Sequence, residues 1–312
     1  MPASILGYVL RFTGWHQAGL AALSVAVFLL SAVPLELQRR IVNDAIGKGS
    51  LQIILGLAMT YAAVALVEQC LKLGLNIYRG WVAESSVRTL RHMVRAADTR
   101  SAEGLQPRSA AGVEVAMVLE EAEPIGGFTG VSISEPLLQG GILASVIGYM
   151  VYLDSSLALL GLAFFVPQMV FVPLLQAAIN RRAAARIVTK RAISGAIVEG
   201  MGPGGGDRGL QGEPIERVFG LNMGIYKLKY AMNLLMNLMH HLSVAAALCL
   251  GGWLAVEGRI EVGTVVAIVG GLGKLNDPWG DLVNWGRELS VVAVKYRLFA
   301  DAMDRVPRAR SH

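Results

Sequence analysis

Long stretches without any Asp, Glu, Lys or Arg constrain this chain more than any other feature of its sequence. A helix needs about 20 apolar residues to cross the hydrocarbon core of a bilayer. Five stretches meet this length, and a sixth, shorter one continues into a charged but amphipathic segment. We therefore predict an all-α, polytopic membrane protein with six transmembrane helices. The predicted spans are residues 15–37, 51–75, 136–153, 156–180, 232–256 and 262–288.

The composition agrees with a membrane protein and excludes several other classes. Of the 312 residues, 54% are hydrophobic and 16% are charged, whereas soluble domains carry about 25% charged residues. A water-soluble enzyme could not bury so much apolar surface in one core. The low charge excludes intrinsic disorder, and a disulfide scaffold is excluded because the only cysteines are Cys70 and Cys249. The net charge of +5 does not predict nucleic-acid binding, since basic residues beside apolar stretches usually orient a membrane protein.

Two of the predicted spans continue as helices beyond the bilayer. After the second span, Val87, Leu90, Val94 and Ala97 recur at spacings of three and four residues. Basic residues gather after the second, fourth and sixth spans, which predicts that these extensions and both termini are cytoplasmic. Asp154 alone separates the third and fourth stretches and predicts a tight turn on the other side. The predicted location is the plasma (inner) membrane.

Five segments in chain order resemble the transmembrane domain of ABC exporters. They are VPLELQRRIVNDAI (33–46), RTLRHMVRAADTRSAEG (88–104), YLDSSLALLGLAFFVP (152–167), GGWLAVEGRIEVGTVVAIVGGLGKLNDPW (251–279) and VKYRLFADAMD (294–304). The order of six spans, with long helical extensions after the second and fourth, is similar to the layout of that family. The resemblance covers residues 1–304, and residues 305–312 are a C-terminal tail.

The resemblance implies a membrane-spanning subunit of a transporter, with export as the direction. In that family the pathway is formed by a dimer, so the expected partner is a second copy or a paralogue. The chain has neither the phosphate-binding pattern G-x-x-x-x-G-K-[ST] nor an ABC signature, because its Gly273–Lys274 pair is followed by Leu275. We expect no enzyme activity from this chain alone, and no bound cofactor or metal. ATP and Mg would bind a separate ATPase subunit.

The same resemblance implies two coupling regions that contact the ATPase subunit, near residues 104–113 and 209–217. The second region departs from the family pattern because residues 200–212 are unusually rich in glycine. The candidate coupling residues are Leu105, Arg108, Val113, Leu210, Glu213 and Glu216.

A polar stripe in the sixth span is the sharpest candidate for function. A charged side chain at the depth of the bilayer costs about 2.5–3.5 kcal/mol on insertion scales. At 100° per residue, the five polar residues of this stripe share one face of the helix. Lys274 and Asp277 are also close enough in sequence to pair, and Pro278 predicts a kink that serves as a gate. The stripe either lines the substrate pathway or forms an ion-paired seam between helices. Its members are Lys274, Asp277, Asp281, Asn284 and Glu288.

Two further stripes are weaker pathway candidates. Glu68 and Lys72 are four residues apart in the favourable order, which favours a structural ion pair. Asn233, Asn237 and His240 lie at helical spacing near the fifth span, beside His241 and three methionines. Adjacent histidines point about 100° apart, so this group does not predict a metal site.

Two alternatives to an ATP-driven transporter remain. The first is an ion-gradient-driven transporter on the same fold, in which Glu68, Asp277, Asp281 and His240 carry protons. The second is a non-transporting membrane scaffold, or a remnant that has lost its ATPase domain.

Overall fold

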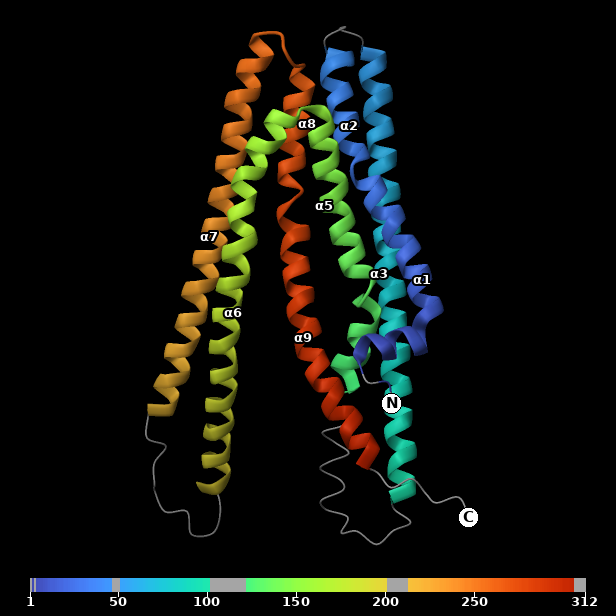
Figure 1. Cartoon of the computed structure of the whole chain (residues 1–312), viewed down its shortest axis with the longest axis vertical. Helices are drawn as coiled ribbons and strands as arrows, with labels where there is room; N and C mark the ends of the chain where they lie inside the picture. The colour runs from blue at the N-terminus through green and yellow to red at the C-terminus, as the bar shows by residue number, and fades with distance from the viewer. Residues whose placement is uncertain (1, 3, 47–50, 102–121, 201–212, 306–312) are drawn as a thin grey trace. The chain divides into compact units, whose positions relative to one another are not determined.

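The computed structural model describes residues 2, 4–46, 51–101, 122–200 and 213–305 of the chain (Figure 1). Over these residues the structure is 95% helical and has no strands, which confirms the all-α prediction. Five helical stretches are long and apolar enough to cross a membrane, and they overlap the first five predicted spans. The sixth predicted span is not among them, because the helix is interrupted within it. The five stretches are Ile5–Asp44, Leu51–Arg95, Ala122–Leu153, Ser155–Lys190 and Glu213–Val256.

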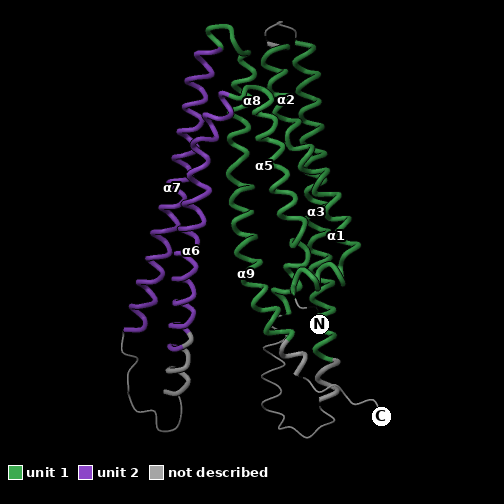
Figure 2. The backbone as a smooth tube through the Cα atoms, in the orientation of Figure 1, with its two compact units in different colours: residues 1–155, 255–312 green, residues 156–254 purple. Residues whose placement is uncertain are grey.

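The chain divides into two compact units (Figure 2). Unit 2 covers residues 156–254 and consists of α6 (Ser155–Gly200) and α7 (Glu213–Val256). Unit 1 covers residues 1–155 and 255–312. Its elements are α1 (Ile5–Ser31), α2 (Val33–Arg40), the π-helix η1 (Ile41–Ile46), α3 (Leu51–Ser101), a helical segment at residues 122–131, α5 (Ser134–Leu153), α8 (Val262–Gly273) and α9 (Asn276–Arg305).

Three helices are much longer than a bilayer requires. The lengths of α3, α6 and α7 are 51, 46 and 44 residues. At a rise of 1.5 Å per residue, α3 is about 76 Å long, whereas the hydrocarbon core is about 30 Å thick. Each of these helices is therefore longer than a single membrane crossing requires.

Local sequence explains several helix boundaries. The Ser4 side chain caps α1 by accepting a hydrogen bond from the backbone N–H of Gly7 at 3.1 Å. Pro34 lies in the first turn of α2, where its missing N–H is tolerated, and α1 ends just before it at Ser31. Asp154 is the one residue between α5 and α6, which confirms the predicted tight turn.

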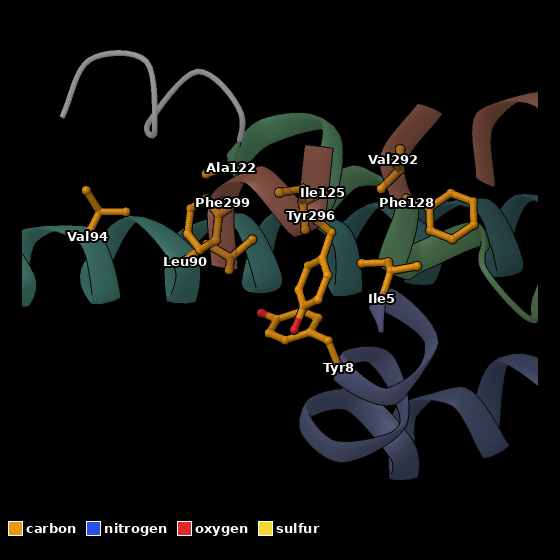
Figure 3. Close-up of a cluster of buried hydrophobic side chains, with 10 residues drawn as sticks. All are labelled: Ile5, Tyr8, Leu90, Val94, Ala122, Ile125, Phe128, Val292, Tyr296 and Phe299. Atoms are coloured by element: carbon orange, nitrogen blue, oxygen red, sulfur yellow. The ribbon is translucent and has the colours of Figure 1, made fainter. Parts of the chain in front are cut away.

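The core of unit 1 lies between helices that are distant in sequence. In this unit α1 packs against α3 and α5, α2 packs against α8, and α5 packs against α8 and α9. One cluster of buried side chains joins α1, α3, the segment 122–131 and α9 (Figure 3). Within it, Tyr296 donates a hydrogen bond to the carbonyl oxygen of Pro2 at 2.9 Å. The cluster consists of Ile5, Tyr8, Leu90, Val94, Ala122, Ile125, Phe128, Val292, Tyr296 and Phe299.

Candidate functional site

The helix that contains the sixth predicted span is broken between α8 and α9. After Gly273 the backbone N–H of Lys274 bonds to Gly271 O at 2.9 Å, and α9 restarts at Asn276. Pro278 lies in the first turn of α9, where a proline needs no hydrogen-bond acceptor. The predicted kink at Pro278 is therefore wrong in form and position. The helix is interrupted at Lys274 and Leu275, and the proline follows the interruption.

Lys274 connects this break to a second one. Its side chain is half-buried, and Nζ donates to the carbonyl oxygen of Ser31 at 2.8 Å. Ser31 is the last residue of α1, and the last carbonyl groups of a helix have no partner within that helix. The predicted ion pair between Lys274 and Asp277 is wrong: the salt bridges of the described residues do not include it, and Asp277 is exposed.

The structure brings Lys274 into electrostatic range of the second predicted stripe. Glu68 Oε1 and Lys72 Nζ form the predicted ion pair at 2.7 Å, and the Glu68 side chain is only 8% exposed. The charges of both residues act on Lys274. This interaction between α3 and the α8–α9 break brings two cations and one anion near one another.

A second buried polar group, the Arg79 node, joins α3, α5 and α9. Arg79 Nη1 lies 2.5 Å from Glu135 Oε2, and Arg79 Nε donates to Ser134 Oγ at 2.8 Å. Gln139 Nε2 donates both to Glu135 Oε1 at 2.8 Å and to Asp281 Oδ2 at 2.9 Å. The node thus consists of Arg79, Ser134, Glu135, Gln139 and Asp281. Sequence reasoning missed Glu135 and Gln139, although their spacing of four residues at the start of a span was a usable signal.

The remaining members of the α9 stripe are exposed. Asp277, Asn284 and Glu288 share a face with Asp281, and all four are exposed on this chain. Ionised side chains are costly against lipid but not against water, a protein partner or polar headgroups.

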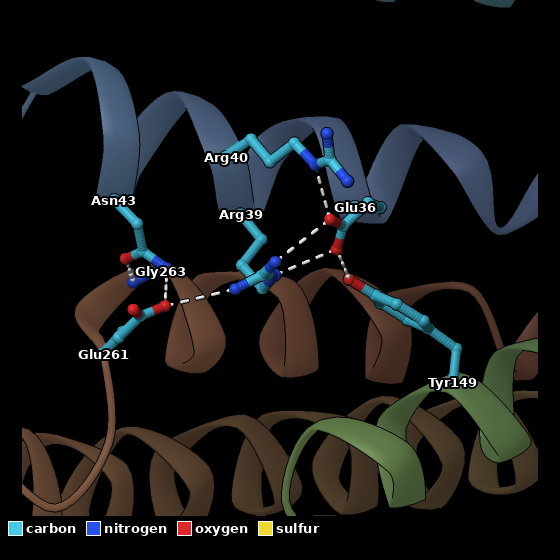
Figure 4. Close-up of polar contacts among 7 residues, drawn as sticks. All are labelled: Glu36, Arg39, Arg40, Asn43, Tyr149, Glu261 and Gly263. Atoms are coloured by element: carbon cyan, nitrogen blue, oxygen red, sulfur yellow. Dashed lines mark hydrogen bonds and ion pairs between the residues drawn. The ribbon is translucent and has the colours of Figure 1, made fainter.

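A third polar cluster joins α2 and η1 to the start of α8 and to α5 (Figure 4). Glu36 accepts hydrogen bonds from Arg39 at 2.9 and 3.0 Å, from Arg40 at 2.6 Å and from Tyr149 at 2.6 Å. Arg39 also bonds to Glu261 at 3.1 Å. Neither Arg39 nor Arg40 was among the predicted site residues.

Asn43 completes this third cluster at the N-terminus of α8. Its Oδ1 accepts from the backbone N–H of Gly263 at 2.6 Å, and its Nδ2 donates to Glu261 Oε2 at 2.5 Å. Asn43 lies within a π-helical turn, a geometry that is frequent at functional sites.

The pathway candidates in unit 2 do not form a buried polar group like those of unit 1. Asn233 and Asn237 are exposed, and His240 is half-buried with its ring centroid 5.5 Å from that of His241. Across the described part of the chain, no group of three or more His, Cys, Asp or Glu side chains is arranged to hold a metal ion. Inside unit 2, Ser243 Oγ donates to Gly161 O at 3.0 Å and ties α7 to α6.

The predicted coupling residues are only partly described. Glu213 and Glu216 lie in the first turn of α7, where the helix dipole stabilises acidic side chains. The other four, Leu105, Arg108, Val113 and Leu210, lie outside the described residues.

Comparison with known proteins gives no match: no protein-family model and no curated sequence corresponds to this chain.

Proposed function

We propose that this chain is the membrane-spanning subunit of an ABC-type transporter. Two copies, or one copy and a paralogue, form the substrate pathway, and a separate ATPase subunit drives it, with export as the direction. The observation that carries this proposal is the exposed polar face of α9, which follows a helix break inside a largely apolar bundle.

The polar face supports a pathway because of its length and its setting. From Asp277 to Glu288 it covers about 16 Å along the helix axis, roughly half the hydrocarbon thickness. Broken helices in transporters commonly flank substrate sites near the middle of the bilayer. A water-filled pathway gives Asp281 and its exposed neighbours the hydration that lipid denies them.

The contact between the start of the chain and α9 supports a sixth crossing. Pro2 accepts a hydrogen bond from Tyr296, near the end of the last helix. An odd number of crossings would separate the two ends of the chain by the membrane. With α8 and α9 together as one interrupted crossing, both ends lie on the same side, and the positive-inside rule favours the cytoplasm.

The surface of unit 2 supports a dimer. Its two helices expose many large apolar side chains, among them Phe219 at 61%, Leu234 at 67% and Leu174 at 64%. Two helices cannot cover these faces for each other. In the proposed assembly, lipid and the helices of a second copy cover them.

The ATPase subunit is the part of the proposal that is tested most directly. The tagged chain is purified from its native membrane in mild detergent, and co-purifying proteins are identified and quantified by mass spectrometry. We expect a protein with a phosphate-binding loop and an ABC signature at one copy per chain. Folded chain that repeatedly purifies without such a protein would contradict the proposal.

The pathway is tested in the reconstituted complex. Asp277→Asn and Asn284→Ala remove polar groups from the exposed face of α9 and leave the described contacts intact. Arg287→Ala is the matched control, because Arg287 is exposed on the same helix about 80° away from the stripe. We expect the first two variants to change transport or substrate-stimulated ATPase activity at least several-fold more than the control. Equal effects from all three would contradict a pathway on this face.

A further inference from the structure

When both of its carboxyl groups are ionised, the Arg79 node holds more negative than positive charge. Arg79 contributes one positive charge, while ionised Glu135 and Asp281 contribute two negative charges. Arg79 contacts Glu135 directly, but Asp281 is bonded only to the neutral amide of Gln139. Glu135 therefore has a cationic partner, whereas among the described residues Asp281 has none in direct contact.

Arg79 itself has an unused donor within the node. The residue is 8% exposed, and its Nη2 is buried without an acceptor among the described residues. A buried donor on a charged group that lacks an acceptor is strongly unfavourable. The second guanidinium nitrogen is thus available for a carboxylate oxygen, as in the bidentate pairs that arginine favours.

Besides Glu135, Asp281 is the carboxyl group that interacts electrostatically with Arg79. The charges of Arg79 and Asp281 act on each other, although the Asp281 side chain bonds to Gln139. An ionised Asp281 gains more from a charged donor than from an amide, because charge-assisted hydrogen bonds are about twice as strong. A protonated Asp281 gains nothing comparable and can remain on Gln139.

We propose that Asp281 is a proton-binding site that switches the position of α9. With a proton bound, the Asp281 carboxyl stays on the Gln139 amide, as in this structure, and the node is neutral. When the proton leaves to water on the exposed side, the carboxylate moves to Arg79 Nη2, and α9 moves with it. This inference concerns the chain itself and does not depend on the ATPase partner proposed above.

The surroundings of Asp281 favour a proton over a larger cation. The gap between the two carboxylates is already bridged by the two hydrogen-bond donors of Gln139, so a metal ion cannot enter without displacing them. The charged groups that act on Asp281 are Arg79 from α3, Glu135 from α5 and Asp277 on α9 itself.

Infrared difference spectroscopy tests the proton site. The purified full chain in lipid nanodiscs is brought from mildly acidic to mildly alkaline pH, and the carbonyl band of protonated carboxyl groups is followed. We expect this band to titrate in the wild type and in the matched control Glu84→Gln, which removes an exposed carboxyl group from α3, and to be lost in Asp281→Asn. A band that persists in Asp281→Asn, that disappears equally in Glu84→Gln, or that is absent from the wild type would overturn the proposal. Asparagine mimics the protonated carboxyl, so an Asp281→Asn chain that does not fold would also contradict it.

Tryptophan fluorescence tests the movement of α9. Trp285 lies one turn after Asp281, and its Nε1 donates to the carbonyl oxygen of Ser132 at 3.2 Å. We expect a change in emission over the same pH interval that is lost in Trp285→Phe and in Asp281→Asn. A change that persists in either variant, or a wild-type emission that does not respond to pH, would overturn the proposed movement.

Discussion

Two adjacent glycines allow a sharp test of the packing in unit 1. Gly126 and Gly127 are both interior to the helical segment 122–131, but they face different surroundings. A Cβ atom on Gly126 would lie 2.6 Å from Val87 N and 2.8 Å from Val87 Cα, which belong to the backbone of α3. A Cβ atom on Gly127 would have no atom within 4 Å. Comparing the stabilities of Gly126→Ala and Gly127→Ala therefore separates the effect of close helix packing from the effect of the helix propensity of alanine.

The expected magnitudes follow from these distances. Ordinary contacts of a Cβ atom begin at 3.4 Å, so Gly126→Ala forces the segment and α3 apart by the better part of an ångström. Overpacking of this kind costs about 1–3 kcal/mol, and removing a helical glycine returns about 0.5–1 kcal/mol. Gly127→Ala receives only the second effect. We expect Gly127→Ala to be the more stable of the two variants by about 1–3 kcal/mol.

The assay is unfolding of the purified chain in mixed micelles by a denaturing detergent, followed by circular dichroism. Both variants are compared with the wild type under identical conditions. Equal free energies of unfolding for the two variants would refute the reasoning, because it would mean that α3 and the segment 122–131 are not in close contact. A larger loss in Gly127→Ala would refute it as well.

Three further predictions use the same unfolding assay. Glu36→Gln removes the shared partner of Arg39, Arg40 and Tyr149, and we expect a loss of about 1–3 kcal/mol. Arg40→Ala should cost less than Glu36→Gln, because the Arg40 side chain is 54% exposed and solvent screens its ion pair. Arg79→Met leaves Glu135 without its cation and should cost about 3–5 kcal/mol; a loss below that of Arg40→Ala would contradict the buried pair. Tyr8→Phe removes a buried hydroxyl that has no hydrogen-bond partner among the described residues, and it should be neutral or stabilising. Tyr296→Phe removes the hydrogen bond to Pro2 and should lower the free energy of unfolding by about 1 kcal/mol.

The sequence predicted much of the helical architecture because the strongest signals were local. Uncharged stretches locate the first five membrane-length helices, and a single polar residue, Asp154, is enough to locate the turn between α5 and α6. The ion pair between Glu68 and Lys72 was also predictable, since residues four apart on a helix are neighbours whatever surrounds them.

The sequence could not predict which polar residues meet across helices. Periodicity assigns a residue to a face of its own helix but does not identify the helix opposite that face. Gln139 and Asp281 are 142 positions apart, and neither the register of α5 nor that of α9 can be read from local pattern. The break at Lys274 was missed for a related reason, because the proline that marks it lies after the interruption rather than within it.

The contact between Lys274 and Ser31 shows that the polar stripe of the sixth predicted span contains residues with different roles. Both α1 and α8 end within unit 1, and the last carbonyl groups of a helix have no donor within that helix. Lys274 supplies such a donor to Ser31 and has Glu68 in electrostatic range. This arrangement favours a structural role for Lys274, as a connection between two interrupted helices. Asp281 is exposed and lacks a direct cationic partner, which favours a role in function. Replacing Lys274 should therefore lower stability first, whereas replacing Asp281 should change the response of α9 while the chain remains folded.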